Sequence, residues 1–227
     1  MKTLPILFLI GLVLCVGGPV SAGGIGELNL SIGGIFPQGN YAQFADPGFT
    51  GNFRLTFRVP GLGFAAGWVD GNFSHFSSDE TYVEIIDDPY FAGADQRVSE
   101  YAVSLHGGLQ IGADTRRGFF RPRVALGPGV YGFQTETVLT IPDVEEPLSD
   151  ETESQWKLGW RGMAGVDLFF VTKWGLSFDF TYDHVLSLDH VDEYREGVGV
   201  VRTGRTARYL SYSIGVTIPL STLNDDG

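Results

Sequence analysis

A strict alternation of apolar and polar side chains constrains the fold of this chain more than any other feature. From Leu210 to Ile218 every second residue is apolar, and the residues between them are small or polar. The same period of two runs through residues 156–170 and 176–182, where the polar face also carries charges. Successive side chains of a β-strand point to opposite faces. The sequence therefore predicts strands with one apolar face and one polar, often charged, face.

Eight segments carry this pattern, with more noise toward the N-terminus. The predicted strands are 26–36, 49–59, 63–76, 99–111, 119–135, 155–171, 175–186 and 207–219. Trp68 and Val69 are adjacent and both apolar, so a regular alternation cannot place both side chains on the apolar face. This predicts a bulge in the third strand. Pro128 lies in mid-strand, where it cannot donate a hydrogen bond to the neighbouring strand.

The connections between these strands alternate in length. The short ones are 60–62, 112–118 and 172–174, and the long polar ones are 37–48, 77–98, 136–154 and 187–206. Short turns at one end of the strands and long loops at the other are typical of transmembrane β-barrels. The spacing therefore favours a barrel that crosses a membrane over a soluble sandwich.

Aromatic residues gather near both strand ends, as they do in the two interfacial girdles of such barrels. Near the short turns lie Phe64, Phe119, Phe120, Trp174 and Tyr209, and toward the long loops lie Phe73, Tyr131, Phe133, Trp156 and Tyr182. A soluble barrel would place its apolar side chains inside and many more charges outside. We therefore expect the apolar face of each strand to meet lipid and the polar face to line the lumen.

Three segments resemble strands of the small eight-stranded outer-membrane barrels of the OmpA, OmpX and OmpW type: Arg121–Tyr131, Trp160–Leu168 and Tyr212–Val216. The resemblance implies an all-β fold, an eight-stranded antiparallel up-and-down transmembrane β-barrel over residues 23–220, with short periplasmic turns and long extracellular loops. It also implies a location in the cell outer membrane. The partners it implies are outer-membrane lipids, lipopolysaccharide and the outer-membrane assembly machinery.

The two ends of the chain lie outside the predicted barrel. Lys2, the apolar run Leu4–Val16 and the small residues up to Ala22 predict a signal peptide at 1–22, cleaved during export through the periplasm. At the other end a short tail at 221–227 follows the last strand. That strand closes on Ile218-Pro219-Leu220, whereas the barrels it resembles usually end on an aromatic residue.

The composition excludes several classes of protein. Asp and Glu number 27 against 15 Lys and Arg, which gives a net charge of −12, so no nucleic-acid partner is expected. Cys15, the single cysteine, lies in the predicted signal peptide, which excludes a disulfide framework and a cysteine-based metal site. Beyond that peptide no apolar run reaches the roughly 18 residues of a transmembrane helix.

Motifs that could hold a cofactor or a metal have simpler explanations. Gly127–Gly132 reads G-x-G-x-x-G, but it lies within a predicted strand and no helix follows it. A dinucleotide site needs that helix, so no cofactor is expected. The acidic residues of the long loops lack the spacing of a calcium loop, and no metal site is expected.

The histidines do not indicate an enzyme. They are His75, His106, His184 and His190, and we expect them to be solvated residues of loops. Ser187 lies near His184, but the His-x-Ser-Asn pattern of lipid A deacylases is absent. Because no nucleophile and base are spaced for catalysis, no catalytic residue is predicted.

The polar faces of the strands bring charged residues into the predicted lumen. The inward cations are Arg54, Arg58, Arg121, Arg123, Lys157 and Arg161, and the inward carboxylates are Glu100, Asp167, Asp179 and Asp183. An eight-stranded barrel is only wide enough for side chains to fill it, so these charges must pair with one another. The sequence therefore predicts a lumen ion-pair network of these ten residues.

One pair of this network follows from strand register. The short turn at 172–174 allows two registers in which lumen residues face lumen residues. Arg161 lies directly opposite Asp183 in one register and diagonal to it in the other, so this pair forms in both. Asp167 faces Asp179 only in the second register.

These observations predict a non-catalytic outer-membrane barrel with a structural or surface-interaction role and a lumen plugged by charged side chains. The alternatives are a narrow passage for small or lipophilic solutes, a lipid A-modifying enzyme and a soluble ligand-binding barrel. No motif identifies an extracellular partner.

Overall fold

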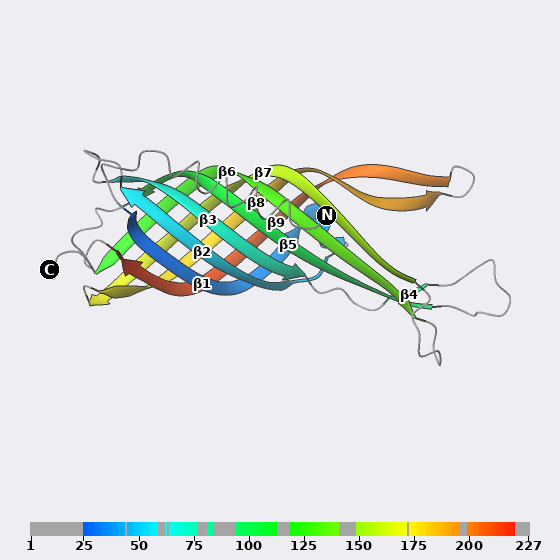
Figure 1. The fold of residues 1–227 in the computed structure, drawn as a ribbon, viewed down its shortest axis with the longest axis horizontal. Helices are drawn as coiled ribbons and strands as arrows, with labels where there is room; N and C mark the ends of the chain where they lie inside the picture. The colour runs from blue at the N-terminus through cyan, green and yellow to red at the C-terminus, as the bar shows by residue number, and fades with distance from the viewer. Residues whose placement is uncertain are drawn as a thin grey trace.

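Eight long antiparallel strands close into a barrel in the computed structural model of the chain (Figure 1). The structure describes residues 25–43, 45–58, 62, 64–76, 81–83, 94–112, 119–140, 149–171, 173–195 and 199–220. The predicted signal peptide and the C-terminal tail lie outside these residues. The predicted all-β, up-and-down architecture is confirmed.

The barrel strands pair in chain order and the ring has no free edge. They are β1 (Ile25–Gln38), β2 (Gly48–Arg58), β3 (Ala65–Phe76), β5 (Ala94–Gly112), β6 (Phe120–Thr140), β7 (Ser149–Val171), β8 (Trp174–Arg195) and β9 (Gly199–Pro219). Pairing of β1 with β9 and of β3 with β5 closes the ring. A short strand, β4 (Thr81–Val83), adds to β5, and a 3-10 helix, η1 (Gly39–Gln43), follows β1. Among the described residues, no helix is long and apolar enough to cross a membrane.

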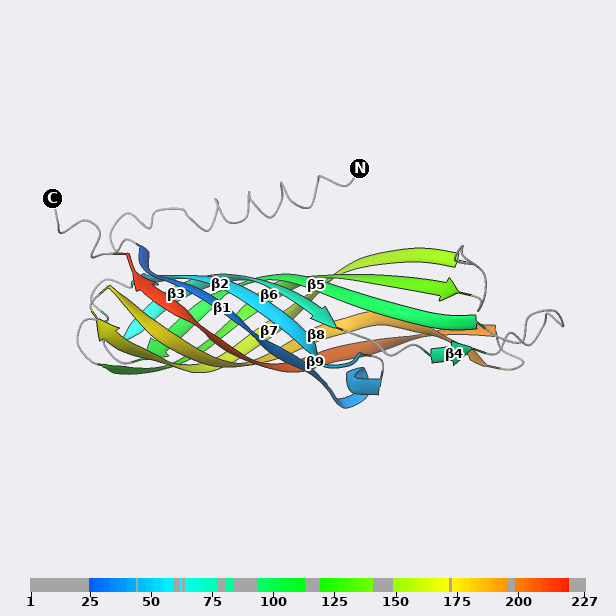
Figure 2. The same cartoon turned by 90° about the horizontal axis from the view of Figure 1, so that it is seen from below.

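Several strands run further toward the long-loop end than the sequence predicted. β7 begins at Ser149 rather than 155, β8 ends at Arg195 rather than 186, and β9 begins at Gly199 rather than 207. The polarity of these segments indicated loops, but an antiparallel ladder satisfies the backbone groups whatever the side chains are. As a result, the β8–β9 hairpin projects beyond the barrel (Figure 1 and Figure 2).

Strand β3 contains no bulge, so that prediction was wrong. Its residues alternate without interruption between inward and outward positions, and its pairing with β2 is regular from Gly48–Phe76 to Arg58–Ala66. Trp68 is 1% exposed and faces the lumen, whereas Val69 faces outward. The error arose because a large aromatic side chain was assigned to the lipid face.

Pro128 is accommodated in a continuous strand. It pairs with Trp160 of β7 and its side chain is exposed on the outside of the barrel. On the other side the β5–β6 ladder runs up to His106–Gly129 and resumes at Leu109–Leu126, with the same register on both sides of the gap. The ladder therefore pauses where proline has no N–H to donate and continues in register beyond it.

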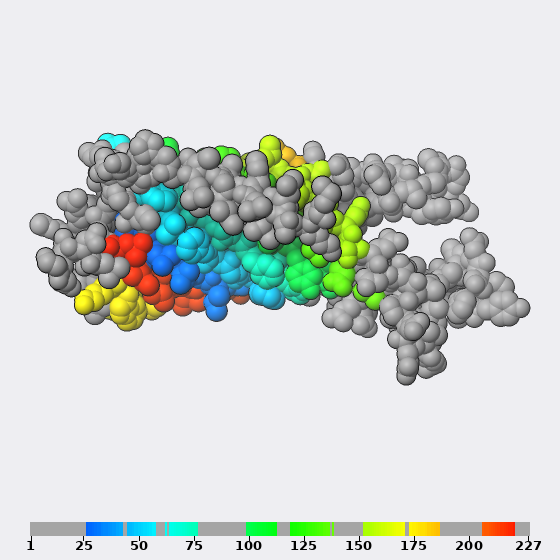
Figure 3. Space-filling view, viewed as in Figure 1, coloured from blue at the N-terminus to red at the C-terminus, as the bar shows by residue number. Residues whose placement is uncertain are grey.

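The barrel has an apolar exterior and a polar interior. Outward residues such as Ile32, Leu109 and Leu158 are 72%, 68% and 65% exposed. Inward charged residues such as Asp70 and Asp183 are buried. Figure 3 shows the closed outer surface over β1, β2 and β9. This polarity is the reverse of a water-soluble barrel and fits a barrel surrounded by lipid.

Three of the aromatic residues assigned to the girdles lie inside the barrel instead. Tyr131, Phe133 and Tyr209 are buried, and Tyr209 lies toward the long-loop end rather than near a short turn. Their odd numbers give Tyr131 and Phe133 the inward parity of Arg123 on β6 and give Tyr209 that of Ser211 on β9, which the girdle assignment overlooked. The remaining assigned residues that are clearly exposed are Phe64, Phe119, Phe120 and Trp174 near the short turns and Phe73 and Trp156 toward the long loops.

The closed ring predicts resistance to SDS. Unheated mature protein should migrate faster on an SDS gel than boiled protein, because no strand edge is open to attack. Gly71→Pro, in the middle of β3, should lower the temperature at which the difference disappears, since proline there removes a donor from the ladder that closes the ring. Equal mobility of unheated and boiled wild-type protein would contradict the closed barrel.

Candidate functional site: the ion-pair network of the lumen

The centre of the lumen holds two carboxylates that share one guanidinium. Arg161 of β7 lies directly opposite Asp183 of β8, so the first of the two possible registers is the one adopted, and Asp167 faces Ser177. Arg161 Nε lies 2.9 Å from Asp183 Oδ1, and its Nη2 lies 3.1 Å from Oδ2, a bidentate contact. Its Nη1 reaches across the lumen to Asp70 of β3, at 3.2 Å from both carboxylate oxygens.

His106 of β5 lies between the same two carboxylates. Its Nδ1 is 2.6 Å from Asp70 Oδ1, and its Nε2 is 3.7 Å from Asp183 Oδ1. The hydroxyl of Tyr131 donates to Asp183 Oδ1 at 2.6 Å, and its ring meets the His106 ring edge to face. We call Asp70, His106, Arg161 and Asp183 the central group.

A second set of charges lies nearer the short turns. Arg123 of β6 contacts Asp167 of β7 and Asp179 of β8, the latter at 2.7 Å. Arg54 of β2 lies 3.2 Å from Asp179 and 3.9 Å from Asp70. We call Arg54, Arg123, Asp167 and Asp179 the lower group; Arg54 joins it to the central group.

The two groups together nearly balance their charges. Three guanidiniums face four carboxylates. His106, the eighth member of the two groups, contacts the carboxylates of Asp70 and Asp183. All eight side chains are buried. Burying a charge without a partner is costly, so the strands that supply these residues are held in one mutual arrangement.

A separate ion pair lies at the short-turn end of the lumen. Arg121 Nη1 lies 3.2 Å from Glu27 Oε1 of β1, and the Arg121 guanidinium stacks over the ring of Phe169 at 3.9 Å. Asn29 donates to Ser177 at 2.6 Å and to Thr217 at 2.9 Å. These contacts connect β1 with β6, β8 and β9 at the short-turn end.

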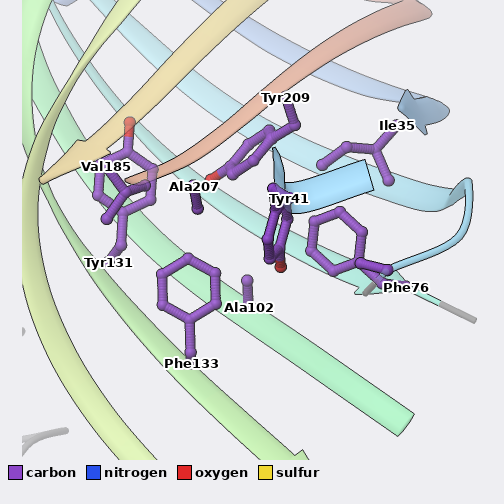
Figure 4. Packing of buried hydrophobic residues seen from close by; sticks show 10 residues of the cluster. Ile35, Tyr41, Phe76, Ala102, Tyr131, Phe133, Val185, Ala207 and Tyr209 are labelled. Carbon is purple, nitrogen blue, oxygen red and sulfur yellow. The ribbon is translucent and has the colours of Figure 1, made fainter. Parts of the chain in front are cut away.

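The long-loop end of the lumen holds a cluster of buried aromatic residues that includes Tyr41 of η1. Tyr41 of η1 lies between Phe76 and Tyr209, with ring centroids 5.6 and 6.5 Å away (Figure 4). Its hydroxyl donates a hydrogen bond to Glu100 of β5. Burial, reinforced by the Glu100 carboxylate, raises the pKa of Tyr41 well above its usual value, so the hydroxyl keeps the proton that it donates.

Most of the ten predicted network residues face the lumen. Arg54, Arg123, Arg161, Asp167, Asp179 and Asp183 form the two connected groups, and Arg121 pairs with Glu27 instead. Glu100 contacts Tyr41 rather than a predicted cation. Lys157 is half-buried on β7, and the side chain of Arg58 lies outside the described residues.

Sequence reasoning missed two members of the central group. Asp70 was overlooked because the parity of β3 was unclear, although Asn72 and Ser74 have the same parity and are also polar. His106 was expected to be a solvated loop residue, and this was wrong: it is 2% exposed inside the barrel. Its shared parity with Glu100 and Ser104 was the signal that could have placed it there.

The glycine motif on β6 serves packing. Gly127–Gly132 lies wholly within the strand, and no helix follows it among the described residues. A Cβ atom on Gly129 would overlap the His106 ring, so the glycine provides the space that this ring occupies. Among the described residues, no group of three or more His, Cys, Asp and Glu side chains is arranged to hold a metal ion.

Comparisons with known proteins agree with this fold. No family model and no curated protein matches the chain. Neisserial surface protein A matches with a TM-score of 0.50 and 14% identity, over 85% of this chain and 95% of its own. A major outer membrane protein of Thermus thermophilus has a TM-score of 0.48, with 14% identity over 86% and 99%. OprG of Pseudomonas aeruginosa has a TM-score of 0.47, with 10% identity over 86% and 96%.

The fold therefore defines the class of this protein. A closed ring of eight antiparallel strands with an apolar exterior is the architecture of a transmembrane β-barrel. The likeness to the Neisserial protein identifies it as the fold of the small outer-membrane barrels.

The shared cation of the central group leads to a stability prediction. Arg161→Met should lower the free energy of unfolding by about 3–5 kcal/mol, because it leaves two buried carboxylates without their common partner. Asp183→Asn should cost less, since Arg161 keeps its contact with Asp70. Urea titration of protein folded into lipid vesicles, followed by tryptophan fluorescence, measures both.

Two further variants make this test specific. Lys173→Gln, at an exposed cation in the turn between β7 and β8, should leave stability unchanged. The double variant Arg161→Met/Asp183→Asn should be more stable than Arg161→Met alone, because only one of the two carboxylates then remains charged. A loss for Arg161→Met no larger than that for Lys173→Gln would refute the shared cation.

The Tyr41–Glu100 contact leads to a second prediction. Tyr41→Phe should destabilise the barrel by about 1–3 kcal/mol, because the buried Glu100 carboxylate loses the hydroxyl that donates to it. In a Glu100→Gln background the same change should cost clearly less, since no charge is then left unsatisfied. Equal costs in the two backgrounds, measured by the same urea titration, would show that the hydroxyl does not support a charged carboxylate.

Proposed function

We propose that the protein spans the outer membrane as a closed barrel over residues 23–220, with a plugged lumen and a structural or surface-interaction role without catalysis. The observation that carries this proposal is the ion-pair network. Its central and lower groups bring buried charged side chains together from β2, β3, β5, β6, β7 and β8. An eight-stranded lumen is narrow enough for such side chains to fill its cross-section.

The long-loop end supports the same role. Tyr41 of η1 packs among the aromatic residues there, which adds a second layer over the network. The β6–β7 ladder extends to Leu139–Ser149 and the β8–β9 ladder to Arg195–Gly199, so both hairpins continue past the barrel wall (Figure 2). Ordered hairpins outside the membrane offer surface for contact with molecules beyond the cell. Outer-membrane lipids, lipopolysaccharide and the assembly machinery are the partners that this placement implies.

Planar-bilayer recording tests the plugged lumen. Purified wild-type protein should show no sustained large conductance. The double variant Arg123→Gly/Arg161→Gly, which removes one guanidinium from each group, should conduct more if the heat-dependent gel shift shows that it still folds. Sustained conductance of the wild-type protein would instead favour a narrow passage for small solutes. A change in lipid A mass on overexpression would favour a lipid-modifying enzyme.

A further inference from the structure

An arginine and a histidine stand side by side on the outer face of the barrel. Arg208 of β9 is paired in register with His184 of β8, and His184 is in turn paired with Trp160 of β7. All three have outward parity, and the Arg208 side chain is exposed. The Trp160 and His184 rings are stacked, with centroids 5.5 Å apart.

Arg208 lies at the upper edge of the apolar belt on β9, whereas on β8 the belt continues one outward residue above His184, to the exposed Leu186. On β9 the outward residues from Leu210 down to Ile218 are apolar or aromatic, and Arg208 is the position directly above them. On β8 the outward residue below His184 is Tyr182, which contacts Trp160 at 5.3 Å. Aromatic residues mark the level at which the hydrocarbon of a bilayer meets its headgroups. The pattern on β9 therefore places the Arg208 guanidinium at headgroup height on the long-loop side, with the His184 imidazole beside it.

Arg208 differs from the arginines of the lumen in its surroundings. Each described lumen arginine contacts at least one carboxylate, as Arg161 does with Asp183. Among the described residues, no carboxylate lies within ion-pair distance of Arg208, and its partner in register on β1 is the neutral Gln38. The Arg208 guanidinium therefore has no carboxylate partner among these residues, and the neutral imidazole of His184 stands beside it with an N–H to donate. A phosphate placed between the two side chains would accept hydrogen bonds from both.

We propose that Arg208 and His184 bind the phosphate group of an anionic lipid in the outer leaflet, with the acyl chains of that lipid lying along Leu210 and Tyr182. This inference rests on the proposed placement in the outer membrane. A guanidinium offers a planar fork of donors that matches a phosphate, and the imidazole adds a donor beside it. The stacked Trp160 ring fixes the orientation of the imidazole.

Native mass spectrometry of detergent-solubilised protein tests the site. The probes are bis-phosphoryl lipid A and the same lipid without its phosphates. Wild-type protein should retain the phosphorylated lipid in preference to the other. Arg208→Gln/His184→Gln should lose about tenfold in that preference, as expected for the loss of charged hydrogen bonds. Arg208→Lys should retain part of it.

The controls separate this site from general charge effects. Lys173→Gln removes an exposed cation at the opposite end of the barrel and should leave the preference unchanged. Equal loss in Lys173→Gln, or no preference in the wild-type protein, would overturn the proposal. Displacement of the lipid by inorganic phosphate at equal concentration would overturn the assignment to a lipid. The heat-dependent gel shift of each variant reports folding and membrane-barrel character independently, so failure of the lipid site leaves the proposed function standing.

Discussion

The pairing of charges across a narrow lumen is the constraint on which the rest of this structure depends. Arg161 contacts carboxylates on two other strands, Asp70 on β3 and Asp183 on β8. A buried guanidinium without such partners would cost several kcal/mol, so these strands can adopt only positions that keep the contacts. A wider barrel would separate the groups and let water between them, whereas eight strands bring the side chains together. The size of the ring and the chemistry of its interior are therefore matched.

Lipid outside and charge inside together fix the register of the strands. A slip of one residue on any strand would move its charges into the bilayer and its apolar side chains into the lumen. The β7–β8 pair illustrates this, because the adopted register sets Asp167 against Ser177 and leaves it free to meet Arg123. In the alternative register two carboxylates would have faced each other. The adopted register therefore keeps these two carboxylates from lying directly opposite each other, while both contact Arg123.

The sequence was informative where side-chain polarity alone decides the outcome. The period of two located all eight barrel strands and indicated the inward parity of Arg161 and Asp183. It failed at Trp68, where a large aromatic was assigned to lipid, and that error hid Asp70. The girdle assignment failed at Tyr131 and Tyr209, whose parity was inward, because a barrel needs bulky inward residues as well as outward girdles. The extended ends of β7, β8 and β9 could not be predicted, because ladder hydrogen bonds between backbones leave no mark on side-chain pattern.

A glycine can belong to an electrostatic network without carrying a polar atom. Gly129 of β6 leaves the volume in which the His106 ring sits, and that ring holds Asp70, which in turn holds Arg161. The contacts that join β5, β3 and β7 therefore depend on the absence of a side chain at residue 129 of β6. A side chain at residue 129 would therefore disturb the ion-pair network as directly as the loss of one of its charges, although residue 129 itself carries no charge.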